Sequence, residues 1–110
     1  MELDSEFETV VMELIIHAGE SRSCSMEALR AARANDWALA DQHLTAAKMA
    51  AREAHLIQTR LIGADEGIGK IPVSLILVHA QDHLMNAMLC RELTEELIHL
   101  HREISVLKNR

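Results

Sequence analysis

The sequence predicts an all-α protein, and two observations lead to this prediction. Hydrophobic side chains make up 49% of the 110 residues, whereas there are only four glycines, one proline and 2% aromatic residues, a composition that favours helices over strands. Long segments repeat apolar residues at three- and four-residue steps, which is the period of an amphipathic helix. We therefore expect an antiparallel three-helix bundle in a single domain of residues 1–110.

The first helix is expected over residues 5–34. Residues 10–18 are apolar except for Glu13 and His17, which is more apolar surface than one contact in a chain of this size can cover. A helix with two apolar sides is expected to pack on a second subunit as well, so the pattern predicts self-association. Gly19 inside this helix predicts a close approach of another helix or a bend.

The second helix is expected to follow the pair Asn35 and Asp36, which interrupts the pattern and offers a capping side chain. Its inward positions recur at the spacing of a left-handed supercoiled bundle. These positions are Trp37, Ala40, Leu44, Ala47, Ala51, Ala54, Gln58 and Leu61. Their small side chains allow close packing, and Trp37 is expected to close one end of the bundle.

A loop is expected at residues 63–73, which hold three of the four glycines and the only proline. The run GADEGIGK is only superficially like a phosphate-binding loop, because it lacks the GxxxxGK[ST] spacing and a preceding strand. We interpret this segment as a mobile connector.

The third helix is expected to begin at a Ser74 cap and to continue to about Leu107. About 34 residues at about 1.5 Å per residue would span about 50 Å, so the monomer must be elongated. One stripe runs along this helix and is apolar except for Asp82. It consists of Leu75, Val78, Asp82, Met85, Leu89, Leu93, Leu97, Leu100, Ile104 and Leu107.

Charge and composition exclude several classes of function. Eleven basic and seventeen acidic residues give a net charge of −6, which argues against nucleic-acid binding and favours basic partner surfaces. No apolar run approaches the roughly 18 residues of a membrane span, and the acidic start at residues 1–6 is unlike a signal peptide. Cys24 and Cys90 lack CxxC spacing and are expected to be buried, reduced thiols. We expect a cytoplasmic protein with no direct membrane insertion.

Polar chemistry is concentrated in residues 78–85, VHAQDHLM. His79, Asp82 and His83 are spaced i, i+3 and i+4, so they project within one sector of the helix. A segment this apolar is expected to be buried, and a buried carboxylate costs several kcal/mol unless it is paired or binds a cation. The presence of Asp82 therefore requires an explanation.

The residues alone leave several explanations open. HxxDH is a weak zinc site for one chain. If the helix lies on a symmetry axis, copies of Asp82 about 5 Å apart would repel by about 3 kcal/mol per pair and need a shared cation or proton. A histidine can carry a phosphoryl group, and the pair His79 and His83 could do acid–base chemistry. The three residues could also be interior polar groups that fix the register of the helices. Spacing alone favours this explanation over a catalytic one.

The third-helix segment at residues 71–88, IPVSLILVHAQDHLMNAM, closely resembles a family signature. The family is the lactose/cellobiose-type enzyme IIA of the bacterial phosphoenolpyruvate-dependent sugar phosphotransferase system. Residues 14–23, LIIHAGESRS, and residues 53–59, EAHLIQT, are similar to its first and second helices. The resemblance covers residues 6–107, and Asn86 stands where the family has threonine.

The resemblance implies a homotrimeric phosphoryl carrier and assigns its site residues. His79 would accept phosphate from HPr and pass it to a cysteine of a cognate IIB for uptake of a lactose-, cellobiose- or chitobiose-class disaccharide. Asp82 of each subunit would hold a divalent cation, Mg²⁺, at the trimer centre, with Gln81 and His83 in support. The loop at residues 63–73 departs most from the family, so the sugar is not specified. The rival is a non-enzymatic, metal-stabilised helical oligomerisation module.

Overall fold

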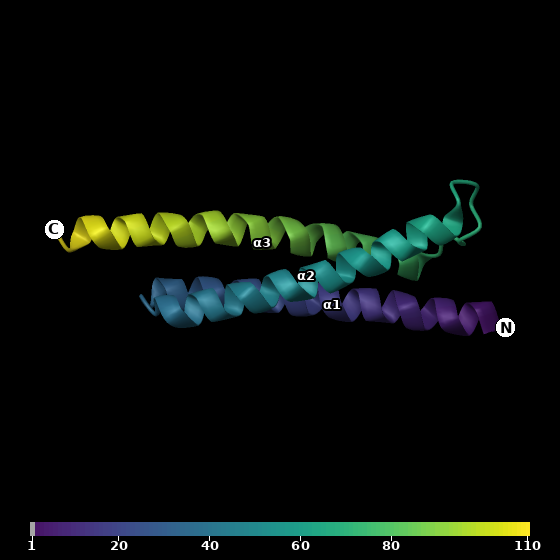
Figure 1. Ribbon diagram of the computed structural model, residues 1–110, viewed down its shortest axis with the longest axis horizontal. Helices are drawn as coiled ribbons and strands as arrows, with labels where there is room; N and C mark the ends of the chain where they lie inside the picture. The colour runs from purple at the N-terminus through teal and green to yellow at the C-terminus, as the bar shows by residue number, and fades with distance from the viewer. Residues whose placement is uncertain (1) are drawn as a thin grey trace.

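The computed structural model describes residues 2–110, with side chains from Glu6 onward, so most side chains of the acidic start at residues 1–6 lie outside the described part. Its helices are α1 (Glu2–Arg33), α2 (Trp37–Asp65) and α3 (Leu75–Lys108). They run up, down and up, so that α1 and α3 are parallel and α2 is antiparallel to both (Figure 1). No strand occurs within residues 2–110, and the predicted all-α antiparallel bundle is confirmed.

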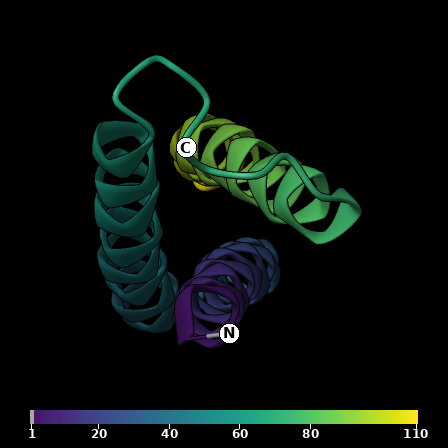
Figure 2. The same ribbon diagram turned by 90° about the vertical axis from the view of Figure 1, so that its right-hand side faces the viewer.

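The bundle is elongated, with principal extents of 63 × 21 × 19 Å, as the length of α3 predicted. α1 contacts both of the other helices, whereas α2 and α3 contact each other much less. Seen along the bundle, α2 and α3 diverge from α1 (Figure 2). The C-terminal turns of α3 project beyond the hairpin of α1 and α2 (Figure 1).

The turn between α1 and α2 closes one end of the bundle. Asn35 has a φ of 58°, a left-handed conformation that asparagine tolerates. Asp36 caps α2 by accepting a hydrogen bond from the backbone N–H of Leu39 at 3.2 Å. Trp37 is half-buried, with Cζ of Arg102 5.3 Å from its ring centroid. Trp37 therefore closes this end, as predicted.

Two clusters of buried side chains join the helices. The first, toward the loop end, contains Val11, Leu14, Ala18, Ala54, Ile57, Leu61, Leu77, Ala80, Leu84 and Ala87. The second, toward the turn, contains Ala28, Ala31, Ala32, Ala40, Leu44 and Ile98. Many of these side chains are alanines, which allow helix axes to approach closely. The predicted inward face of α2 is confirmed, since its members are buried except for half-buried Trp37 and Gln58.

The predicted stripe of α3, which we call the outer stripe, does not enter this core. Its apolar members are exposed, from 40% at Ile104 to 86% at Leu75. Asp82 is also exposed, so the prediction of its burial is wrong within one chain. The reason is that α3 is apolar on two sides, and the side with Ala80, Leu84 and Ala87 faces the core. The close approach predicted at Gly19 is also wrong, because a Cβ built there would meet nothing within 4 Å.

The loop between α2 and α3 is organised by Asp65, the last residue of α2. Its carboxylate accepts hydrogen bonds from the backbone N–H of Gly69 at 3.3 Å and of Ile71 at 2.9 Å. Ser74 caps α3 as predicted, by accepting a hydrogen bond from the N–H of Leu77 at 3.2 Å. Gly63, expected in the loop, instead lies in the last turn of α2. Nowhere in the described chain is a helix long and apolar enough to span a membrane.

Candidate functional site

His79 lies in the second turn of α3 and is exposed. Its ring contacts that of His83, with centroids 4.6 Å apart and planes at 86°. This edge-to-face contact limits rotation of the His79 ring without covering it. The structure thus brings together the two histidines that the sequence placed in one sector, and it offers a solvent-accessible imidazole held by a second one.

Asp82 lies on the outer stripe, between Val78 and Met85 on either side along α3. Its Oδ1 accepts a hydrogen bond from Nδ2 of Asn86 at 3.1 Å. Among the residues with described side chains, no basic group forms an ion pair with Asp82. Asp82 is therefore a carboxylate without an ion-pair partner among the described side chains, and its neighbours along the stripe are exposed apolar residues.

Gln81 lies on the other side of α3 from His83 and does not join the histidine pair. Nε2 of Gln58 on α2 donates a hydrogen bond to Oε1 of Gln81 at 2.5 Å, in a half-buried position. This hydrogen bond joins α3 to α2 near the end of the bundle that carries the loop between them. Gln81 also borders a hollow of about 230 Å³ beside the loop. Any support that Gln81 gives to His79 within one chain is therefore indirect, through the position of α3.

Arg22 of α1 was not identified by the sequence reasoning, although it lies within the stretch LIIHAGESRS. It lines a hollow of about 330 Å³ together with Asp82, His83 and Asn86. Arg22 comes close to α3 because α1 and α3 run parallel, a relation that local sequence patterns do not reveal. A basic side chain thus lies beside the predicted site residues.

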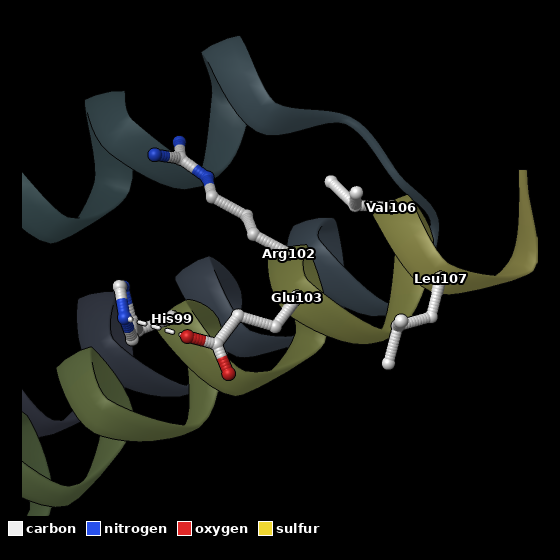
Figure 3. Close-up of a pocket in the computed structure, with 5 residues that line it drawn as sticks. All are labelled: His99, Arg102, Glu103, Val106 and Leu107. Carbon is white, nitrogen blue, oxygen red and sulfur yellow. Dashed lines mark ion pairs between the residues drawn. The ribbon is translucent and has the colours of Figure 1, made fainter. Parts of the chain in front are cut away.

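Another hollow, of about 510 Å³, lies at the C-terminal end of α3 (Figure 3). It begins about 30 Å along the helix from His79. Here His99 forms an ion pair with Glu103, with 3.2 Å between Nε2 and Oε1. Arg102 extends toward the neighbouring ribbon (Figure 3). Its Nη2 donates a hydrogen bond to Oδ1 of Asp41 on α2 at 2.7 Å. His99 is exposed on the surface of α3.

No three His, Cys, Asp or Glu side chains within the described part of the chain are grouped so as to hold a metal ion. The one-chain zinc site that HxxDH weakly suggested is therefore not formed. A cation on Asp82 would need ligands from other subunits, so that prediction is not tested by a single chain. Cys24 and Cys90 are both free and half-buried. Burial raises the pKa of the Cys24 thiol, and the nearby Glu20 and Glu27 raise it further.

Comparison with known proteins shows extensive similarity. Residues 9–102 match the model of a family described as PTS system, lactose/cellobiose specific IIA subunit. The chain is 54% identical over 99 residues to the N,N'-diacetylchitobiose-specific EIIA component of Escherichia coli K12, covering 90% of this chain and 85% of that protein. The cellobiose-specific enzyme IIA of Bacillus anthracis has a TM-score of 0.87 and 41% identity, covering 91% of this chain and 92% of the other.

A second solved structure includes a partner protein. The chitobiose IIA of Escherichia coli, solved in complex with HPr, has a TM-score of 0.79 and 52% identity to this chain. The match covers 90% of this chain and 96% of that one. Sequence and fold therefore point to the same group of proteins.

Proposed function

Because this chain belongs to the lactose/cellobiose-specific IIA family of the sugar phosphotransferase system, we propose that His79 is the residue that carries its phosphoryl group. The chain is a phosphotransferase component that receives phosphate from HPr and passes it to a cognate IIB during disaccharide uptake. The observation that supports His79 is its exposure together with the contact of its ring with His83. The non-enzymatic module is not favoured.

The transfer requires little covalent chemistry from the protein. A neutral ring nitrogen of His79 attacks phosphorus, a new N–P bond forms, and the N–P bond to the HPr histidine breaks. A cysteine thiolate of IIB then attacks the same phosphorus, and His79 leaves as a neutral imidazole. Because one nitrogen replaces another in the first step, positioning and electrostatics supply most of the catalysis. His83 contributes by holding the attacking ring.

Partners would dock beside His79 on apolar side chains. Val73 and Ile76, which lie outside the outer stripe, are 82% and 40% exposed near the start of α3. The net charge of −6 favours the approach of basic surfaces. We propose a cytoplasmic location, which a phosphoryl relay that begins at phosphoenolpyruvate and passes through HPr would require.

We further propose that three copies assemble along the outer stripe, with one Asp82 from each subunit at the centre. The stripe supports this arrangement, since nine apolar side chains along one face of α3 are exposed in the single chain. A carboxylate oxygen from each subunit fits the preference of Mg²⁺ for oxygen ligands. The cation would compensate three like charges, and no step of the phosphoryl transfer depends on it.

The test is phosphoryl uptake from phosphoenolpyruvate, enzyme I and HPr, followed by mass spectrometry. The wild-type chain should gain one phosphoryl group that is acid-labile and base-stable, and His79→Gln should gain none while its circular dichroism is unchanged. His99→Gln, which removes an exposed histidine from the same helix, should be phosphorylated normally. Uptake by His79→Gln would overturn the assignment, and no uptake by the wild type would favour the rival module.

A further inference from the structure

Arg22 and Asp82 are opposite charges that line the same hollow, one from α1 and one from α3. Neither takes part in an ion pair with any side chain that the structure describes. The remaining lining residues are His83 and Asn86, so Asp82 is the acidic side chain that lines this hollow together with Arg22. The hollow thus brings together a basic and an acidic side chain that otherwise lack ionic partners.

The hydrogen bonding of Asp82 leaves room for a second donor. Nδ2 of Asn86 donates to Oδ1, and no hydrogen bond from a described side chain reaches Oδ2. A guanidinium presents several donors in a planar fork that matches a carboxylate, and it is less strongly hydrated than an ammonium group. Arginine is therefore well suited to a carboxylate that becomes enclosed on assembly.

We propose that Arg22 is a built-in counter-charge for Asp82, so that each subunit compensates its own carboxylate at the trimer centre. This inference rests on the proposed trimer with Asp82 at its axis. In such a trimer, three arginines compensate three carboxylates when no divalent cation is present. Arg22 and the cation then compete for the same oxygen atoms.

Because of this competition, removing Arg22 should weaken trimer association but strengthen Mg²⁺ binding. Without the guanidinium, the carboxylates repel one another and the trimer associates less tightly in EDTA. The same carboxylates then have no guanidinium that competes with the cation for their oxygen atoms, so they bind Mg²⁺ more tightly. If Arg22 merely supported the fold of α1, its removal would not strengthen cation binding. Its removal would then weaken the trimer whether or not residue 82 is charged.

The experiment measures trimer association by sedimentation equilibrium in EDTA and Mg²⁺ affinity by titration calorimetry. Arg22→Gln should weaken association by about tenfold per arginine removed and should bind Mg²⁺ more tightly than the wild type. The Arg22→Lys chain should have an association constant and an Mg²⁺ affinity between those of the wild type and Arg22→Gln, because lysine keeps the positive charge but lacks the planar guanidinium. Arg33→Gln, which removes the same charge from the exposed last turn of α1, should differ from the wild type by no more than about twofold.

The double variant Arg22→Gln/Asp82→Leu distinguishes a charge effect from a structural one. It should associate as tightly as Asp82→Leu alone, since there is then no carboxylate to compensate. An Arg22→Gln trimer of wild-type stability in EDTA, or one weakened equally with leucine at position 82, would overturn the inference. A monomeric wild-type chain would overturn this inference and the proposed trimer together, whereas phosphorylation of His79 is scored separately by mass.

Discussion

Replacing Asp82 by leucine should make the trimer more stable. Three carboxylates about 5 Å apart form three pairs, and each pair repels by about 3 kcal/mol at an effective dielectric constant of about 20. Compensation by a cation or by Arg22 offsets part of this repulsion but restricts those groups. Leucine removes the repulsion and continues the outer stripe, and burying its side chain contributes about 1.5 to 3 kcal/mol per subunit. We expect a net gain of several kcal/mol in association.

The gain is measured by sedimentation equilibrium over a dilution series in EDTA, and by the dependence of Tm on protein concentration. Asp82→Leu should remain trimeric at concentrations at which the wild type dissociates, and it should no longer bind Mg²⁺ in calorimetry. Asp82→Asn is the control, since it removes the charge without adding apolar surface, and it should give an intermediate value. An Asp82→Leu chain that dissociates as readily as the wild type would refute the position of Asp82 at the trimer axis.

Two further predictions concern the loop and a thiol. Asp65→Ala should lower the free energy of unfolding, measured in urea, by about 1–3 kcal/mol, because two backbone N–H groups lose their acceptor. Amide hydrogen exchange at Gly69 and Ile71 should also become faster. Unchanged exchange at these two residues would contradict the role of Asp65 in anchoring the loop. Because the pKa of the Cys24 thiol is raised, little thiolate forms near neutral pH. In a Cys90→Ser chain, alkylation should therefore be slower than that of free cysteine at pH 8 and accelerate at higher pH; a rate at pH 8 equal to that of free cysteine would contradict the raised pKa.

The helices could be predicted from the sequence because their signals are local. The apolar period, the Asp36 and Ser74 caps and the glycine-rich loop all act within a few residues, and the observed helix ends lie close to the predicted ones. Which face of α3 enters the core could not be predicted in this way. Both faces are apolar, and the outcome depends on how closely Ala80 and Ala87 let α1 approach.

The candidate site could be predicted only where its residues are near one another in sequence. His79 and His83 are one helical turn apart, and their contact follows from spacing. Arg22 is 60 positions from Asp82, so only the parallel packing of α1 and α3 places them on one hollow. The bond between Gln58 and Gln81 similarly joins two helices and depends on their register. Contacts between helices therefore determine these neighbours, and the apolar periodicity of each helix could not predict them.

The positions of His79 and Asp82 on α3 explain how one helix can serve both assembly and chemistry. Three residues along a helix amount to a rotation of about 300°, so His79 lies about 60° around α3 from Asp82. His83 lies about 100° around in the same direction, between His79 and the side of α3 that faces α1. When the outer stripe is covered by other subunits, His79 is at the edge of the contact rather than at its centre. A partner can therefore reach the imidazole while His83 holds it from the side away from the axis.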